Sequence, residues 1–203
     1  MTSKRVFDFA VSLAGLIVLC PLLIATAIVI RLESAGPSFF FQERVGLHGR
    51  RFRLIKLRTM RAAGPGEHRQ ITVGSDPRIT CVGHVLRRTK LDELPQLLNV
   101  LKGEMSLVGP RPEVPRYVAL YTPEQQAVML SVRPGLTDFA AIEFCNEGEI
   151  LARSADPEKA YVHEIMPKKY RLYERYVAEA SMLLDLKLIA RTIITIVRRR
   201  VTQ

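Results

Sequence analysis

The stretch TKLDELPQLLNVLKGEMSLVGPRP, from Thr89 to Pro112, links two adjacent acids to a constrained arginine. Asp92 and Glu93 open a segment whose leucines recur three and four residues apart, which is typical of a helix with one apolar face. A lysine followed by Gly103 predicts the end of that helix. Beyond it, Arg111 stands between two prolines in a stiff loop. Acids beside a rigid arginine are groups that a metal-assisted phosphoryl transfer requires.

The acid pair has an ordinary interpretation as well, because acids are common at helix N-termini, where they favour the helix dipole. Thr89 or Asp92 is expected to cap this helix. Arginines on both sides favour phosphate chemistry instead, since Arg87 precedes the pair, Arg111 follows it, and a guanidinium suits phosphate oxygens. An ionised aspartate can attack phosphorus and form an acyl phosphate, while a second carboxylate such as Glu93 holds Mg²⁺.

The overall composition indicates one core and an anionic partner. The 203 residues carry 30 basic and 20 acidic side chains, a formal net charge of +10. Nucleic acid, a phosphorylated metabolite and an anionic membrane surface all fit that charge. The three cysteines, Cys20, Cys81 and Cys145, form no Cys-x-x-Cys pair, so the pattern favours neither a zinc site nor a disulfide framework. A reducing, cytosolic setting is the plain inference.

A membrane segment is predicted near the N-terminus. No charged residue occurs from Phe9 to Ile30, a run long enough to cross a hydrocarbon core of roughly 30 Å. A cleavable signal peptide fits poorly, because the run is too long and no small-residue cleavage site follows it. Pro21 lies inside the run after Cys20, so this helix should kink or break there.

Basic residues flank this apolar run on both sides, and they bear on its topology. Lys4 and Arg5 precede it, and many arginines and lysines follow it. Basic residues prefer the cytoplasmic side. A helix that enters, turns at the Cys-Pro pair and leaves by the same face keeps every positive charge inside, whereas a simple span exports two side-chain charges and the terminal amine. We therefore expect residues 1–33 to form a re-entrant membrane helix, with a straight span as the alternative.

The following segment predicts a small basic strand region. Residues 39–58 contain an aromatic run, a hairpin-like segment with two glycines, and a stretch in which basic and apolar residues alternate as in a half-buried strand. Lys56 and Arg58 belong to that alternating stretch, whose cationic face suits solvent or lipid phosphates. Aromatic residues are too few here for a nucleic-acid stacking platform. An exposed loop over 62–75 and a short helix over 82–89 lead to the acid pair.

Five short motifs occur in order along the chain and carry a specific resemblance. They are Lys4-Arg5-Val6-Phe7-Asp8, Phe41-Gln42-Glu43-Arg44-Val45-Gly46, Lys56-Leu57-Arg58-Thr59-Met60, Leu91-Asp92-Glu93-Leu94-Pro95-Gln96 and Val108-Gly109-Pro110-Arg111-Pro112. Together they resemble the bacterial sugar transferases known as small monotopic phosphoglycosyl transferases. The resemblance implies transfer of a phosphosugar from a UDP-sugar to a polyprenol phosphate, usually undecaprenyl phosphate, with release of UMP. It also implies Mg²⁺, a re-entrant membrane helix and an active site on the cytoplasmic face of the bacterial inner membrane.

Carried over by position, the resemblance assigns roles to individual residues. Asp92 matches the nucleophile that forms a covalent phosphosugar intermediate, and Glu93 its Mg²⁺-associated partner, so that both are candidate metal ligands. Positions that contact phosphates or form the matching basic motif are Lys56, Arg58, Arg87 and Arg111. The family often has Ser-Pro at the helix break, where this chain has Cys20-Pro21. The proline is retained, but a serine hydroxyl is lost.

The C-terminal half predicts further helices. Residues 114–130 favour one helix, and residues 132–138 a loop in which Arg133 either meets the nucleotide or forms a surface salt bridge. Asp138-Phe139 replaces the family's frequent Gly-Trp, which favours the subgroup acting on modified amino sugars. Four tyrosines in a charged helix over 156–177 predict a core or interfacial stripe. The amphipathic residues 182–200 lie in the membrane interface or pack on the domain.

The sequence thus predicts a mainly helical α+β protein, with residues 1–33 as the membrane helix and residues 34–203 as the catalytic domain. Expected partners are a UDP-sugar, undecaprenyl phosphate and membrane phospholipids, without nucleic acid, and the oligomeric state, including a homodimer, stays open. The expected activity is the first membrane step of glycoconjugate assembly. The alternative is a membrane-tethered basic module that binds nucleic acid or lipid without catalysis.

Overall fold

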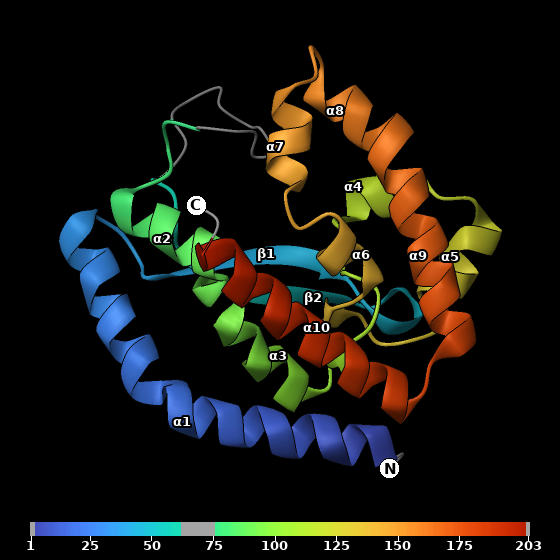
Figure 1. Cartoon of the computed structure of the whole chain (residues 1–203), viewed down its shortest axis with the longest axis horizontal. Helices are drawn as coiled ribbons and strands as arrows, with labels where there is room; N and C mark the ends of the chain where they lie inside the picture. The colour runs from blue at the N-terminus through green and yellow to red at the C-terminus, as the bar shows by residue number, and fades with distance from the viewer. Residues whose placement is uncertain (1–2, 62–75, 202–203) are drawn as a thin grey trace.

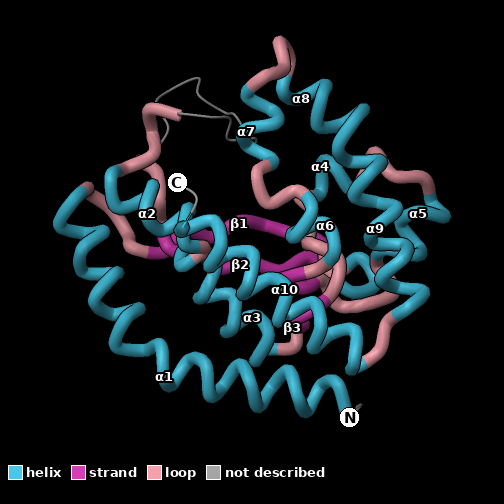
Figure 2. Tube along the Cα trace, viewed as in Figure 1, coloured by secondary structure: helices cyan, strands magenta, loops and turns pink. Residues whose placement is uncertain are grey.

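The structure is a computed structural model, and it describes residues 3–61 and 76–201. Helices dominate it and two small two-stranded sheets lie at its centre, so the mainly helical α+β prediction is confirmed (Figures 1 and 2). The loop predicted over residues 62–75 lies outside the described residues. Core residues gather where α9 and the sheets meet, with Tyr173 and Tyr176 almost completely buried.

A β-hairpin lies in the middle of the molecule (Figure 1). β1 (Phe39–Val45) pairs antiparallel with β2 (Arg51–Leu57) through a short 3₁₀ turn, η1 (Leu47–Gly49), which confirms the predicted strand region. The alternation of exposed basic and buried apolar residues holds up to Leu54 and then stops, because Ile55 is buried as well. Lys56 is therefore only partly exposed, and its ammonium faces the interior of the molecule.

The segment after β2 leads to the acid pair through α2 (Cys81–Thr89), whose N-terminus is capped by the Thr80 hydroxyl. The acid pair itself does not begin an α-helix as expected. It lies in a 3₁₀ helix, η2 (Leu91–Gln96), and only then does α3 (Leu97–Lys102) begin. The expected cap by Thr89 or Asp92 was wrong, since neither side chain caps η2. Pro95 has no N–H to offer an α-helical ladder, which favours the tighter turn.

The C-terminus of α3 agrees with the prediction, because Gly103 ends it in the left-handed conformation at φ 82°. The residues that follow form β3 (Ser106–Val108), which pairs in parallel with β4 (Gly135–Thr137). A loop was expected over residues 132–138, and that prediction was wrong for β4. A Cβ on Gly135 would overlap the backbone of Gly109. The two backbone segments approach this closely only because both residues lack side chains.

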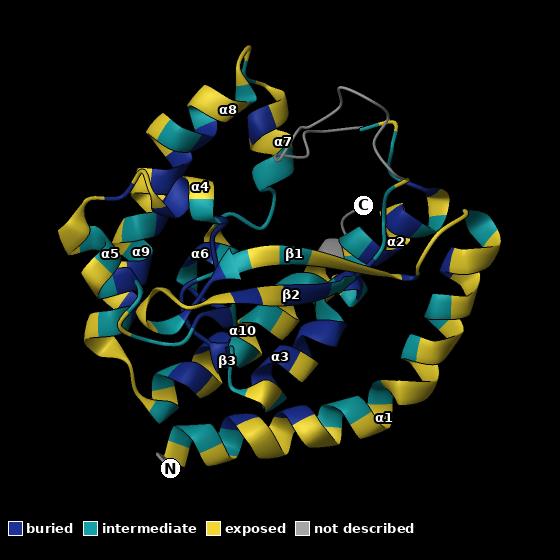
Figure 3. Ribbon diagram, turned by 180° about the vertical axis from the view of Figure 1, so that it is seen from behind, coloured by how far each residue is buried: buried dark blue, intermediate teal, exposed yellow. Residues whose placement is uncertain are grey.

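The N-terminal helix α1 (Ser3–Glu33) is a single helix that is long and apolar enough to cross a membrane. It changes direction near its middle, where Pro21 interrupts its hydrogen-bond ladder (Figure 1). Exposed residues run along its outer side (Figure 3). Near its N-terminal end, the Arg5 guanidinium donates to the carbonyls of Val100 at 2.5 Å and Leu101 at 2.8 Å.

The C-terminal end of α1 is attached to the same body of the protein. Arg58 donates hydrogen bonds to the carbonyls of Ser34 at 2.6 Å and Ile30 at 3.3 Å. Glu33 accepts a bond from the backbone N–H of Val82 at the start of α2. Both ends of the apolar helix are therefore fastened to the globular part of the chain.

The C-terminal half is built from short helices and two long ones. The predicted single helix over 114–130 was wrong, because Pro123 starts a new helix behind the capping box of Thr122. The helices are α4 (Pro115–Val118), α5 (Pro123–Met129), α6 (Phe139–Glu143), α7 (Glu147–Ala152), α8 (Pro157–Ala160), the π-helical η3 (Tyr161–Ile165), α9 (Met166–Glu179) and α10 (Met182–Val201). Three of the four tyrosines predicted to form a core or interfacial stripe are core residues, since Tyr161, Tyr173 and Tyr176 are buried and Tyr170 is partly buried. α10 packs on the domain through Leu188, while Leu183 and Val197 stay exposed.

Candidate active site

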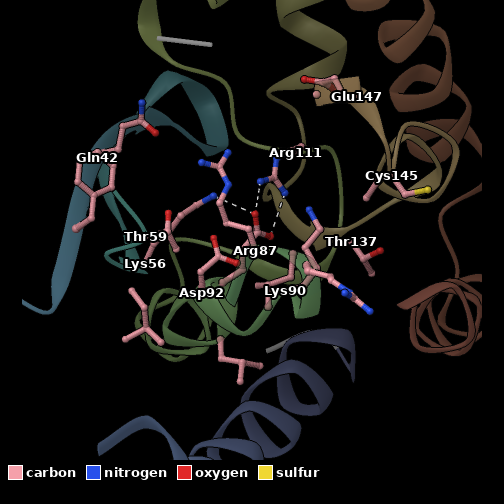
Figure 4. A pocket seen from close by; sticks show the side chains of 18 of the residues that line it. Gln42, Lys56, Thr59, Arg87, Lys90, Asp92, Arg111, Thr137, Cys145 and Glu147 are labelled. Carbon is pink, nitrogen blue, oxygen red and sulfur yellow. Dashed lines mark hydrogen bonds and ion pairs between the residues drawn. The ribbon is translucent and has the colours of Figure 1, made fainter. Parts of the chain in front are cut away.

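One large cavity of about 1,800 Å³ contains the acid pair. β2, α2, η2 and the loop that carries Arg111 all contribute to its lining, and Figure 4 shows their side chains converging on it. Of the residues expected from the sequence, the structure brings Lys56, Arg87, Asp92, Glu93 and Arg111 together here.

Glu93 is held between two cations. Its Oε1 accepts a hydrogen bond from the Lys56 ammonium at 2.9 Å and another from the Arg111 guanidinium at 2.5 Å. Its Oε2 accepts a further bond from Arg111 at 3.2 Å, so the guanidinium reaches both oxygens (Figure 4). Burial alone would raise the pKa of Glu93, but Arg111 and Lys56 outweigh it and hold that pKa well below its usual value. Glu93 is a stable anion that fixes two cations in the cavity wall.

The two cations differ in how burial affects them. Glu93 raises the pKa of Arg111 further, and it does so against the effect of burial. Burial dominates for Lys56 and lowers its pKa, although Glu93 opposes this. Arg111 thus serves as a permanent charge.

Asp92 lies beside this cluster but is not part of it. The residue is 7% exposed, and its Oδ1 is buried without a hydrogen-bond partner among the described residues. Burial and, next, the charge of Glu93 raise the pKa of Asp92, while Lys56 and Lys90 oppose that shift. A buried carboxylate oxygen without a donor is costly unless a ligand satisfies it. Asp92 is therefore the acid that remains free to meet an electrophile or a metal ion.

Two further cations lie next to Asp92. The side chains of Arg87 and Lys90 line the cavity, and neither forms a side-chain hydrogen bond or ion pair with the described residues. Lys90 connects α2 to η2 in the left-handed conformation at φ 59°, which is uncommon for a residue with a Cβ and concentrates at functional sites. Lys90 was not among the residues predicted from the sequence, although a lysine two residues before the acid pair was a usable signal.

Two of the predicted phosphate contacts, Arg58 and Arg133, donate hydrogen bonds to backbone carbonyls in this structure. Arg58 lines the cavity, but its guanidinium donates to the backbone at the end of α1. The structure places Arg133 outside the residues that line this cavity, where it donates to the carbonyl of Gly103 at 2.9 Å. Neither of the two alternatives for Arg133, a nucleotide contact or a surface salt bridge, describes this contact. Its guanidinium satisfies a carbonyl left at the end of α3.

Arg111 is positioned by the parallel β3–β4 pair. The Asp138 carboxylate, directly after β4, accepts hydrogen bonds from the N–H of Arg111 at 2.9 Å and from the N–H of Ala141 at 2.6 Å. One acid therefore caps α6 and fixes the backbone of the arginine loop. Burial raises the pKa of Asp138 to about 6, against the effect of these two bonds.

A magnesium ion is compatible with the acid pair. The described residues contain no group of three His, Cys, Asp or Glu side chains that could hold a metal ion alone. Mg²⁺ often uses only one or two carboxylates and takes its remaining ligands from water and substrate phosphates. The unpartnered Oδ1 of Asp92, with Glu93 next to it, meets that requirement once a diphosphate is present.

An unpartnered acid among fixed and free cations, close to a long apolar helix, is the arrangement of an enzyme that handles phosphate groups at a membrane. The chain belongs to the bacterial sugar transferase family, whose model matches residues 1–199. It is 37% identical over 192 residues to the UDP-glucose:undecaprenyl-phosphate glucose-1-phosphate transferase of Caulobacter vibrioides, covering 94% of this chain and 68% of that protein.

Two other relatives extend the comparison. The uncharacterized sugar transferase EpsL of Bacillus subtilis is 39% identical over 193 residues, which are 95% of this chain and 86% of that protein. The UDP-N-acetylgalactosamine-undecaprenyl-phosphate N-acetylgalactosaminephosphotransferase of Aeromonas hydrophila is 36% identical over 195 residues, 95% of this chain but only 43% of that protein. Membership of this enzyme family sets aside the alternative of a basic binding module without catalysis.

Proposed function

We propose that this protein transfers a phosphosugar from a UDP-sugar to undecaprenyl phosphate, giving undecaprenyl-diphosphate-sugar and UMP, as the first membrane step of glycoconjugate assembly. The observation that carries the proposal is the unpartnered Oδ1 of Asp92 beside the Glu93 cluster and the free side chains of Arg87 and Lys90. Relatives named as undecaprenyl-phosphate phosphotransferases support the same reaction.

In the first step, a carboxylate oxygen of Asp92 attacks the sugar-linked phosphorus of the UDP-sugar. The new O–P bond forms while the bond to the bridging oxygen breaks, and UMP leaves with that electron pair. Arg87 and Lys90 offer the charge that the diphosphate needs, because neither is engaged by another side chain within residues 3–61 and 76–201. Lys56 and Arg111 remain fixed by Glu93, so their positions are set before the substrate binds. Mg²⁺, when held by Asp92 and Glu93, supplies further charge neutralisation.

In the second step, a phosphate oxygen of undecaprenyl phosphate attacks the phosphorus of the aspartyl phosphosugar. The diphosphate linkage forms, and the Asp92 carboxylate leaves in its original state. Splitting the exchange in this way lets one carboxylate serve both substrates in turn. No proton needs to be transferred in either step when the acceptor phosphate is ionised.

The attachments of α1 support a re-entrant topology. Arg5 binds the end of α3 near one end of the helix, and Arg58 and Val82 bind the other end. A folded domain lies on one side of a membrane, so a helix fastened to it at both ends enters and leaves by the same face. The basic residues around both ends make that face cytoplasmic. The exposed apolar side of α1 is then the part that enters the lipid.

UMP release tests the proposed reaction. Purified protein is mixed with Mg²⁺, undecaprenyl phosphate and each UDP-sugar of a panel that includes UDP-glucose, UDP-N-acetylgalactosamine and modified amino sugars. At least one donor should give sustained UMP release that depends on both substrates. Asp92→Asn should abolish it, whereas Asp76→Asn, outside the acid pair, should retain it. Full activity of Asp92→Asn, or release of UMP by no donor, would contradict the proposal.

A further inference from the structure

The cavity that contains the acid pair extends past Arg111 into a second polar region. Figure 4 shows Glu147 on the far side of Arg111 as seen from Asp92, and the charge of Glu147 helps to raise the pKa of Arg111. Residues that line this region come from the arginine loop, α7, η3 and α9. They are Glu113, Glu147, Tyr161 and Lys169, and we call the space that they line the α7–α9 pocket.

An ion pair between Lys169 and Glu147 joins α9 to α7 at this pocket. The Lys169 side chain is only 6% exposed, and its ammonium also lies 5.0 Å from the centre of the Tyr161 ring. The Glu147 side chain keeps 29% of its surface exposed. A buried ammonium needs a paired charge, so Lys169 fixes Glu147 in place while the Glu147 carboxylate stays accessible from the cavity.

A second pair of opposite charges lies behind the first. Glu113 accepts a hydrogen bond from the Tyr161 hydroxyl at 2.7 Å, and its other oxygen lies 3.9 Å from the Arg44 guanidinium. Arg44 also donates to the carbonyl of Pro112 at 2.8 Å, which fixes the arginine loop. The two cations and two carboxylates of these pairs cancel in charge.

The charge of the pocket differs from that of the space around Asp92. Arg87 and Lys90 supply positive charge next to Asp92, which suits phosphate groups. Glu149 of α7 also lines the cavity, but it is exposed and its charge is screened by solvent. A polar ligand group without a net charge therefore matches the α7–α9 pocket, and a phosphate does not.

The pocket also suits the part of the donor that stays in place through both steps. In the proposed reaction UMP leaves and the lipid acceptor arrives, whereas the sugar remains attached to the same phosphorus. Glu113, Tyr161 and Lys169 are at most 5% exposed, so this end of the cavity is walled by buried residues. α7 lies on the side of the molecule away from α1, the helix around which a lipid acceptor is expected (Figures 1 and 3).

We propose that the α7–α9 pocket holds the sugar of the donor, and that the Lys169–Glu147 pair selects a sugar without a net charge. This inference rests on the proposed function and adds the substrate class. Glu147 accepts hydrogen bonds from the sugar hydroxyls, and Lys169 is a positioning residue that holds the Glu147 carboxylate toward them. A uronic acid is rejected because its carboxylate meets that of Glu147.

Donors of different charge test the proposal. The second-order rate constant of the UMP burst is measured with UDP-glucose, UDP-N-acetylgalactosamine and UDP-glucuronic acid, without acceptor. The inhibition constant of UMP, which has no sugar at its phosphate, reports nucleotide binding separately. The variants are Glu147→Gln and Lys169→Met, and Glu158→Gln serves as the matched control, because Glu158 pairs with Arg116 on the surface and does not line the cavity.

The wild type should prefer its best uncharged donor to UDP-glucuronic acid by about 100-fold or more. Glu147→Gln should slow the burst with that uncharged donor by about tenfold and shrink the preference by a similar factor. Lys169→Met leaves an unbalanced negative charge and should enlarge the preference instead. Loss of packing alone cannot shift the preference in opposite directions. Glu158→Gln should match the wild type, and UMP should inhibit every variant equally.

Three results would overturn the assignment of the pocket. They are a wild type that prefers UDP-glucuronic acid, an unchanged preference in Glu147→Gln, and a loss of UMP inhibition in Glu147→Gln that parallels the slower burst, which would place the nucleotide in the pocket. A wild type that gives no UMP burst with any donor would overturn the proposed function itself.

Discussion

At the scale of residues, the site separates two adjacent carboxylates into different roles. Glu93 accepts bonds from Lys56 and Arg111, and its pKa is held well below the usual range. Asp92 keeps one oxygen unpartnered, and burial raises its pKa. Environments that shift the pKa values of two neighbouring acids in opposite directions are typical of active sites in which the two acids have different roles.

The charge of Glu93 should be visible in the pH dependence of the UMP burst. As the proposed nucleophile, Asp92 would attack only when ionised, so we expect the burst rate to fall as the pH drops through its pKa. Glu93 raises that pKa, second to burial. Glu93→Gln removes this negative charge, and the acid limb of the pH–rate profile should move to lower pH while the maximal rate falls. If the acid limb of the variant lay at the same or a higher pH, the charge of Glu93 would not raise the pKa of Asp92.

The planar guanidinium of Arg111 should be required for a fast UMP burst. Its guanidinium reaches both oxygens of Glu93, which a lysine cannot reproduce. Arg111→Lys should lose one charge-assisted hydrogen bond, roughly 1.5–3 kcal/mol, and the UMP burst should slow by about 10- to 100-fold. Arg116→Lys, at a largely exposed ion pair, serves as the control and should leave the burst unchanged. Equal burst rates in the two variants would show that the fork geometry is unimportant.

At the scale of elements, α2 is seated by a glycine. A Cβ on Gly83 would overlap the backbone carbonyl of Thr59, just after β2. Gly83→Ala should force α2 and its Arg87 away from the acid pair, at a cost of about 1–3 kcal/mol in the free energy of unfolding and with a slower UMP burst. Gly49→Ala has open space around the new Cβ, and its left-handed backbone makes it destabilising by about 1 kcal/mol without a change in the burst. A Gly83→Ala protein with the wild-type midpoint of thermal unfolding and burst would refute this role.

Some of these helices and strands could be predicted from the sequence, and others could not. The apolar length of α1, the hairpin, α2 and the glycine that ends α3 follow from local patterns, and the structure confirms each of them. β4 could not be found in this way, because three residues are too short for an alternating pattern and its partner β3 is 27 or more residues away. The leucine spacing suggests an α-helix that begins at the acid pair, but Pro95 favours a 3₁₀ turn there. The expected side-chain cap is therefore missing.

Within the site, residues that belong to the sequence motifs were predicted, whereas the hydrogen bonds that position some of them were not. Asp92, Glu93 and Arg111 belong to short sequence motifs, and the folded chain brings all three to the same cavity. The bond from Arg133 Nε to the carbonyl of Gly103 could not be predicted, because only the folded chain brings Arg133 to the end of α3. Asp138 was noted only as a departure in sequence, since its bond to the N–H of Arg111 depends on the β3–β4 pairing.

The docking of α1 rests on a buried acid. Asp8 is 2% exposed and accepts hydrogen bonds from the Ser106 hydroxyl at 2.8 Å and from the N–H of Leu107 at 3.3 Å. Asp8→Asn should lower the free energy of unfolding by about 1–3 kcal/mol. A double-mutant cycle with Ser106→Ala, followed by thermal unfolding in detergent, should show non-additive losses. Strict additivity would mean that the two side chains do not interact.

At the scale of the whole molecule, both ends of α1 are attached to one globular body, and this predicts the topology in the cell. Ser3→Cys is made in a variant without Cys20, Cys81 and Cys145. In intact cells whose outer membrane is permeabilised, a membrane-impermeant maleimide in the periplasm should leave this cysteine unlabelled, and lysis should expose it. Labelling before lysis would establish a straight span and contradict the re-entrant helix.

We propose, as the central step of the reaction, that Asp92 forms a covalent bond to the phosphosugar. The most direct measurement is intact-protein mass spectrometry after mixing the protein with Mg²⁺ and its UDP-sugar in the absence of acceptor, followed by peptide mapping. We expect an added sugar phosphate on the peptide that contains Asp92, lost on addition of undecaprenyl phosphate and never formed by Asp92→Asn. Turnover with the same donor but without any adduct, or an adduct on another residue, would contradict it.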